Sequence, residues 1–279
     1  MIMNRLGIIG GSGLTKLENL KITKRQMVQT PFGEPSGPLI TGILNGCEAI
    51  FLARHGYGHT IPPHKINYRA NIWAFKELGV KNIIAAAAVG GIREDMAPGK
   101  LAVPDQLIDY TYRRESSYFD GRDSGVKHID FSYPYSQHLR EALITAAENV
   151  AISVVPEGVY GVTAGPRLET AAEVNRLERD GCTMVGMTAM PEAALARELE
   201  LDYATCAFVV NWAAGRTEIL TGSLSTSSRC SGRTEIPAGS SSASSRPTET
   251  IIDMKEIEKY MQLGTQQLRQ LLAGILPLL

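Results

Sequence analysis

The sequence predicts an α/β fold in which a mostly parallel sheet is covered by helices. Short apolar runs typical of strands alternate with longer runs that have helical periodicity, and several strand-like runs are apolar throughout, as in sheets buried on both faces. Strands that alternate with helices favour parallel pairing, and ligands of such sheets bind beyond the carboxyl ends of the strands. The expected strands are 6–10, 49–54, 82–90, 158–164, 183–188 and 204–210, and the expected helices are 69–78, 137–150, 169–180, 190–200 and 253–276.

Composition excludes several classes of function. A chain of 279 residues with 44% hydrophobic residues fits one large α/β domain, and a net charge of −1 with a pI near 6.5 gives no sign of a nucleic-acid or membrane partner. No apolar run reaches the roughly 18 residues of a membrane helix, and the first residues are expected to form a strand rather than a signal peptide. Four scattered cysteines without a metal-binding spacing are typical of a reduced, cytoplasmic protein.

One segment interrupts the alternation of strands and helices. Residues 216–247 are rich in Ser, Thr, Gly and Arg, and the motif GRTEI occurs both at 215–219 and at 232–236. Such a composition buries too little apolar surface to offset the entropy of ordering. Because only one helix follows, we expect a flexible Ser-rich insertion within a single domain that spans residues 1–279.

Two strand-end loops carry groups that suit an oxyanion. GIIGGSGL (7–14) places glycines and Ser12 after a strand, which fits either a phosphate site or a tight structural turn. Arg54 and His55 lie at the carboxyl end of the next expected strand, and a guanidinium at this position suits an anion. For His59 and His64 an exposed polar loop is favoured over a metal site, because their spacing has no helical context and includes no carboxylate.

Three further polar residues lie near expected helix starts. Glu169 is interpreted as a carboxylate that favours the helix dipole, ahead of a ligand contact. Thr188 is interpreted as a helix cap, with donation to an anion as the alternative. Glu192 follows Pro191 and is interpreted as a structural residue compatible with the dipole.

Together these motifs resemble a known family. The stretches ARHGYGHTIPPHKINYRANIWAFKELGV, GGIREDMAPGKLAVPDQLIDYT, AGPRLETAAE and VGMTAMPEAALARE are similar to the signature regions of 5′-methylthioadenosine phosphorylases, and most similar to the bacterial methylthioinosine branch. The resemblance covers almost the whole chain outside the Ser-rich segment. It implies a single-domain nucleoside phosphorylase fold with a twisted mixed sheet, a homotrimer, orthophosphate as co-substrate, and no metal or organic cofactor.

The resemblance also implies roles for individual residues. Those matching phosphate-binding positions are Ser12, Arg54, His55 and Thr188. Met187 matches the residue that lies against the ribose, and His128 matches a histidine near the 5′ end of the nucleoside that is supplied across the subunit interface. Ala87 departs from the family, which usually has Thr or Asn there, so that only backbone N–H groups of Ala87 and Ala88 remain to contact phosphate.

The segment FVVNWAAG (208–215) bears on the choice of base. Methylthioadenosine phosphorylases carry Asp at the positions of Asn211 and Ala213, and those carboxyl groups suit the amino group of adenine. Asn211 donates to O6 or N7 of a 6-oxopurine and Glu169 accepts from N1–H, as in the oxopurine-specific relatives. We therefore expect phosphorolysis of S-methyl-5′-thioinosine, with Asn211 as the catalytic residue.

Three alternatives stay open from the sequence alone. They are a methylthioadenosine phosphorylase with a relaxed base site, a general 6-oxopurine nucleoside phosphorylase, and a protein without activity whose site is disabled by the insertion and by Ala87.

Overall fold

A computed structural model describes residues 5–11, 20–121, 125–216 and 253–279 of the chain. The strands are β1 (Leu6–Gly10), β2 (Leu20–Gln26), β3 (Leu39–Leu44), β4 (Cys47–Ala53), β5 (Asn82–Gly91), β6 (Leu101–Ala102), β7 (Gln106–Asp109), β8 (Val154–Val155), β9 (Val159–Val162), β10 (Met184–Gly186) and β11 (Asp202–Trp212). The helices are α1 (Tyr68–Glu77), α2 (Gln137–Asn149), α3 (Ala171–Arg179), α4 (Ala189–Glu198) and α6 (Met254–Ile275), with short 3₁₀ turns at Pro63–Lys65 and Leu276–Leu278.

The strands form one mixed sheet built around β5. Along the main path the order is β2-β3-β4-β1-β5-β10-β9-β7, while β11 pairs with β5 and β6. The pairings of β1 with β4 and β5, and of β11 with β5, are parallel, whereas β10 meets the end of β5 in the antiparallel sense. The twisted mixed sheet that the resemblance implies is therefore confirmed.

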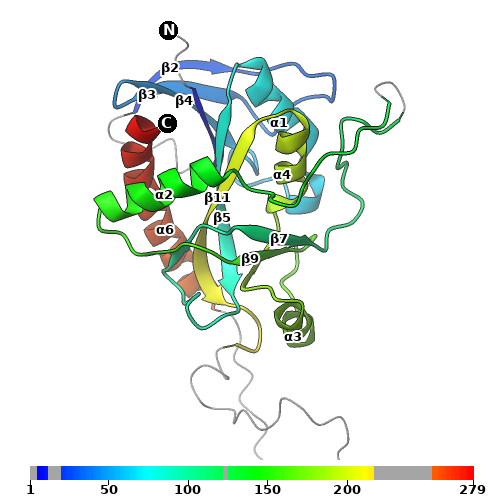
Figure 1. Cartoon of the computed structure of the whole chain (residues 1–279), viewed down its shortest axis with the longest axis vertical. Helices are drawn as coiled ribbons and strands as arrows, with labels where there is room; N and C mark the ends of the chain where they lie inside the picture. Colours follow the sequence, from blue (N-terminus) through cyan, green and yellow to red (C-terminus); the bar gives the residue numbers. More distant parts are fainter. Residues whose placement is uncertain (1–4, 12–19, 122–124, 217–252) are drawn as a thin grey trace, which may run out of the picture.

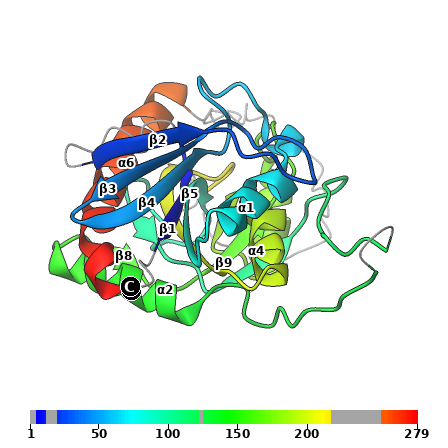
Figure 2. The same cartoon turned by 90° about the horizontal axis from the view of Figure 1, so that it is seen from above.

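Helices cover both faces of the central strands, with α2 and α6 on one side and α1 and α4 on the other (Figures 1 and 2). The side chains of β5 alternate between the two apolar cores, since Ile84 and Ala86 pack in the core of α2 and α6 while Ile83 and Ala85 pack in the other. This explains why the apolar runs of β5 and β11 show no polar alternation. All expected strands and helices are present.

Branching of the sheet at β5 creates an opening that positions the site. Strand β1 pairs with β5 only as far as Ala85, and β10 pairs with it only at Gly90 and Gly91. The edge of β5 between these two contacts has no strand partner among the described residues. The loops that follow β4, β10 and β11 converge on this open edge.

Candidate active site

A cavity of about 490 Å³ lies over the open edge of β5. Its walls contain every residue with an expected site role except Ser12 and His128. Ser12 lies outside the described residues, and the side chain of His128 is exposed and does not line the cavity. Further wall residues include His59, Pro63, Pro166, Leu168, Val210, Ala214, Met254 and Ile257.

Arg54 is held at the cavity by a buried carboxylate. Its Nε and Nη2 atoms donate to the two oxygens of Glu192 over 2.7 and 2.8 Å, and Nη1 donates to the Ala86 carbonyl over 2.8 Å. The two side chains are 3% and 0% exposed. A guanidinium has five N–H hydrogens, so one on Nη1 and one on Nη2 have no partner in the described part of the chain. Those two hydrogens are available to an anion.

Two side chains, Arg54 and Tyr203, stabilise the buried negative charge of Glu192. Burial, the largest single effect, lowers the pKa of Arg54, but the charge and hydrogen bond of Glu192, together with smaller effects of Tyr203 and Tyr68, leave that pKa raised. The guanidinium therefore stays protonated. Tyr203, from β11, also donates its hydroxyl to Glu192 over 2.8 Å. Glu192 therefore connects α4 with the end of β4 and with β11, a role that its position after Pro191 did not indicate.

His55 presents a neutral imidazole to the cavity. Its Nδ1 atom lies 2.9 Å from the Ile61 carbonyl, which only accepts, so we assign the proton to Nδ1 and the free lone pair to Nε2. Burial and the adjacent charge of Arg54 lower the pKa of His55 to about 4. The ring of His59 stacks on His55 at 4.3 Å between centroids. His59 is exposed as expected yet lines the cavity, whereas His64 is exposed and does not.

Thr188 and the edge of β5 supply further donors. Thr188 is the N-cap residue of α4, but its side chain makes no capping hydrogen bond, so the interpretation as a helix cap is wrong. The buried hydroxyl lines the cavity instead. Because strand residues alternate the edge to which their N–H and C=O point, Ala88 shares the edge on which the Ala86 carbonyl meets Arg54. The N–H of Ala88 is thus directed to the open edge, and that of Ala87 to β11.

The opposite wall comes from β11 and from the loop before α3. Asn211 follows an irregularity in the register of β11 and donates one Nδ2 hydrogen to the Trp212 carbonyl over 2.6 Å. The other amide hydrogen and the Oδ1 atom have no hydrogen-bond partner among the described residues. Ala213 is buried against Ile92 and Val185 in a small apolar core. The absence of a carboxyl group at Ala213 therefore leaves this part of the wall apolar.

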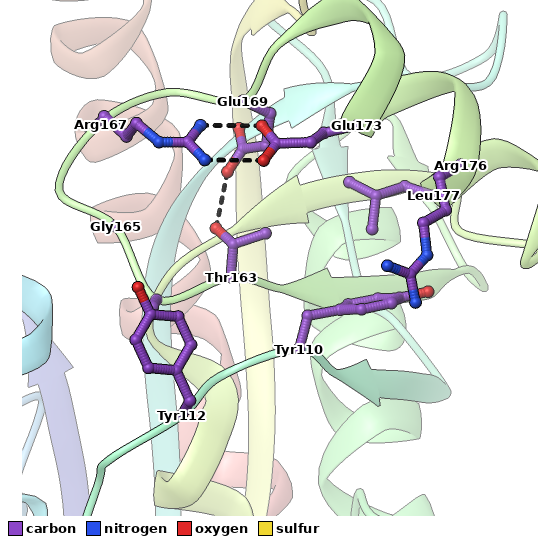
Figure 3. Close-up of a pocket in the computed structure, with 10 residues that line it drawn as sticks. Tyr110, Tyr112, Thr163, Gly165, Arg167, Glu169, Glu173, Arg176 and Leu177 are labelled. Carbon is purple, nitrogen blue, oxygen red and sulfur yellow. Dashed lines mark hydrogen bonds and ion pairs between the residues drawn. The ribbon is translucent and has the colours of Figure 1, made fainter.

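Glu169 is not part of the first turn of α3. The helix begins at Ala171 with Thr170 as N-cap, and Glu173 completes a capping box with Thr170. The dipole interpretation of Glu169 is therefore wrong, since Glu173 occupies that position. Glu169 accepts a hydrogen bond of 2.6 Å from the Thr163 hydroxyl and lines both the main cavity and a second one of about 370 Å³ (Figure 3).

Comparison with known proteins identifies the family. Residues 5–229 match the sequence pattern of the Phosphorylase superfamily. The chain belongs to the phosphorylase superfamily.

Individual relatives of this phosphorylase are similar over most of its length. A probable S-methyl-5′-thioinosine phosphorylase of Pseudomonas syringae pv. tomato is 54% identical over 220 residues, which are 78% of this chain and 89% of the relative. A 6-oxopurine nucleoside phosphorylase of Pyrococcus furiosus is 50% identical over 76% of this chain and 81% of its own. The structure of methylthioadenosine phosphorylase from Schistosoma mansoni in complex with adenine superposes with a TM-score of 0.82 at 30% identity, covering 99% of this chain and 91% of that one.

Arg114 is a residue of this phosphorylase that the sequence did not single out. Its guanidinium donates to the carbonyls of Met187 over 2.9 Å and Ala164 over 2.9 Å, and also to those of Met190 and Thr163. Three of these carbonyls belong to the loops after β9 and β10, which carry Thr188 and precede Glu169, and that of Met190 belongs to the start of α4. Arg114 therefore fixes two walls of the cavity against each other. The motif YRRES around it has no chemical signature that would reveal this role.

The described part of the chain holds no group of three or more His, Cys, Asp or Glu side chains arranged for a metal ion. The described helices also include none that is both long enough and apolar enough to span a bilayer.

Proposed function

We propose that this phosphorylase cleaves S-methyl-5′-thioinosine with orthophosphate to give hypoxanthine and 5-methylthioribose 1-phosphate. One observation carries the proposal: an amide, Asn211, and a carboxylate, Glu169, line the same cavity as Arg54. An amide donor and a carboxylate acceptor match O6 or N7 and N1–H of a 6-oxopurine. The curated relatives whose names include S-methyl-5′-thioinosine support the same substrate.

In the proposed reaction phosphate is held by donors at the open edge of β5. Arg54 offers its two remaining N–H hydrogens, Thr188 its hydroxyl and Ala88 its backbone N–H. The resemblance adds Ser12, which lies outside the described residues. The neutral His55 contributes differently, because its Nε2 lone pair accepts a hydrogen bond from a protonated phosphate oxygen. Held in this way beside C1′, phosphate reacts with the advantage of a high effective concentration.

During bond exchange the C1′–N9 bond breaks as a C1′–O bond to phosphate forms. The ribosyl group passes through a state with oxocarbenium character, while the purine leaves with the electron pair of the C1′–N9 bond and takes up the proton that hydrogen phosphate gives up on forming the ester. The free amide hydrogen of Asn211 stabilises the negative charge on N7 and O6 by about 2–4 kcal/mol, by analogy with oxyanion donors. Met187 lies against the ribose. The reaction uses phosphate as co-substrate and calls for no cofactor.

The 5′-methylthio group fits the apolar wall formed by Met254 and Ile257 at the start of α6, together with Val210. His128 belongs to this end of the substrate only if a neighbouring subunit supplies it. A homotrimer, as the resemblance implies, is therefore part of the proposal, as is a cytoplasmic location.

A second candidate is a general 6-oxopurine nucleoside phosphorylase, which the Pyrococcus furiosus relative favours. It would bind the base through the same residues, Asn211 and Glu169, and would accept a 5′-hydroxyl group beside Met254 and Ile257.

Product chromatography tests the proposal. Methylthioinosine incubated with the purified protein should yield hypoxanthine and a pentose 1-phosphate only when phosphate is present. Hypoxanthine released equally well without phosphate would indicate hydrolysis and contradict the proposal.

A further inference from the structure

Glu169 has an oxygen that the protein leaves free. Its Oε1 accepts the Thr163 hydroxyl at 2.6 Å, and no hydrogen bond to Oε2 comes from the described residues. Because Glu169 precedes the N-cap of α3, the helix does not use its carboxylate either. Oε2 is therefore available to a donor in the cavity.

The nearest cation does not compete for that oxygen. Arg167 forms a bidentate pair with Glu173 at 2.7 and 2.8 Å, and Figure 3 shows the carboxylate of Glu169 next to this pair. The hydrogen bonds to Glu173 raise the pKa of Arg167, and the charge of Glu169 adds to this effect. Glu173 thus takes both arms of the Arg167 fork, and Glu169 keeps its acceptor for a ligand.

Thr163 is itself fixed in place. It follows the last residue of β9, and its backbone N–H donates to the Gly186 carbonyl over 2.8 Å. Its hydroxyl has one hydrogen and two acceptors in range, Glu169 Oε1 at 2.6 Å and the Gly186 carbonyl at 3.3 Å. The shorter, charge-assisted bond is the stronger one. A rigid strand end therefore sets the direction of a carboxylate that stands on a loop.

We infer that Thr163 is a positioning residue for base choice, since it orients the Glu169 carboxylate so that Oε2 accepts the N1–H of a 6-oxopurine. The inference rests on the proposed function. Without the Thr163 hydroxyl, the carboxylate is free to rotate toward Arg167 or solvent, and the preference for a base that donates at N1 falls. Adenine has no N1–H, so cleavage of methylthioadenosine depends less on the orientation of the Glu169 carboxylate.

The test compares Thr163→Val with Thr163→Ser. Valine keeps the shape of threonine but removes the donor, whereas serine keeps the hydroxyl. A hydrogen bond to a charged group corresponds to at least about a tenfold effect. We expect Thr163→Val to lower the ratio of kcat/KM for methylthioinosine to that for methylthioadenosine by about tenfold, with the KM for phosphate unchanged, and Thr163→Ser to restore most of the ratio.

Thr183→Val is the matched control. Within the described part of the chain, the Thr183 hydroxyl, which is also partly buried, donates only to the Val159 carbonyl, at 3.3 Å, and it lines neither cavity. An unchanged ratio in folded Thr163→Val would overturn the inference, as would equal losses for both nucleosides together with a raised KM for phosphate. A parent enzyme that cleaves methylthioadenosine but not methylthioinosine would contradict the proposed function, and the inference with it.

Discussion

Arg54 and Glu192 form a bidentate ion pair that lies almost wholly out of solvent beneath the open edge of β5. Removal of one partner from such a pair leaves an uncompensated buried charge and typically costs about 3–5 kcal/mol. The same guanidinium is the expected phosphate ligand. Arg54 therefore both neutralises Glu192 in the folded protein and offers donors to phosphate. A substitution that keeps the positive charge is needed to test phosphate binding without leaving Glu192 uncompensated.

Arg54→Lys should weaken phosphate binding more than nucleoside binding. Lysine keeps the charge but lacks the planar fork that bonds Glu192 and an oxyanion at once. We expect the KM for phosphate to rise about tenfold or more, which corresponds to one charge-assisted bond, and the KM for nucleoside to change by less than about threefold. Arg93→Lys is the control, because Arg93 forms an exposed bidentate pair with Asp95. Equal phosphate dependence in parent and Arg54→Lys would remove Arg54 from the phosphate site.

Asn211→Asp combined with Ala213→Asp should shift the enzyme toward adenine nucleosides. The change replaces a donor by acceptors that suit an exocyclic amino group. Mismatched buried polar groups cost about 1–3 kcal/mol each, so the preference for methylthioinosine should fall by about 10- to 100-fold or more. The measurement is kcat/KM for both methylthio nucleosides. If the double variant keeps the preference of the parent, base recognition lies elsewhere.

His55 should make the folded protein less stable as the pH falls below about 6.5. Its pKa of about 4 in the folded protein lies below the usual 6.5, so between these values the unfolded chain binds the proton and the folded protein does not. The contribution of neutral His55 to the free energy of unfolding is complete above pH 6.5 and is lost as the pH falls toward 4. Thermal unfolding of parent and His55→Gln at pH 7.5 and 5 checks this: the parent should lose more stability than the variant. A parent that gained relative stability at pH 5 would indicate a protonated His55.

The expected insertion at 216–247 has a structured first residue. Arg216 is 2% exposed, pairs with Glu178 at 3.1 Å and donates to the Asn175 side chain over 2.9 Å. Residues 217–247 lie outside the described part, and their expected flexibility stays a prediction. A deletion should therefore begin after Arg216, and loop closure costs only about 0.6 kcal/mol per doubling of length.

Deletion of 217–247 should leave the melting temperature within a few degrees of the parent and the KM for methylthioinosine equal or lower. A deletion that also removes Arg216 should melt earlier, because α3 loses its buried partner. Loss of folding or of activity in the shorter deletion would show that the segment is an integral part of the enzyme.

The sequence predicts the central fold because β5 and β11 are apolar on both faces and their flanking helices have clear periodicity. It does not reveal β2 or β3. Strand β2 lies at the sheet edge with most of its side chains exposed, so LKITKRQ shows little apolar signal. In β3, Gly42 interrupts the run because a Cβ there would lie 2.6 Å from Leu20 Cδ1.

Some residues of the cavity could be predicted from the sequence and others could not. Those in family motifs, such as Arg54 and Asn211, are placed together as expected. Glu192 lies in the first turn of α4, as its interpretation as a dipole-compatible residue requires. Its pairing with Arg54 and the role of Thr163 are missed because they depend on partners from other elements, 138 residues away for the Arg54–Glu192 pair. A helix-start carboxylate looks the same in sequence whether it favours the dipole, as Glu173 does, or turns away from the helix, as Glu169 does.

The most direct test of the central claim is a competition experiment. Equimolar methylthioinosine, methylthioadenosine and inosine are incubated with the protein and excess phosphate, and the consumption of each nucleoside is followed by chromatography. Relative rates in such a mixture report the ratios of kcat/KM. Because Asn211 and Glu169 match a 6-oxopurine, we expect methylthioinosine to be consumed first, inosine more slowly and methylthioadenosine last. Faster consumption of methylthioadenosine than of methylthioinosine would contradict the assignment of Asn211 and Glu169 to a 6-oxopurine.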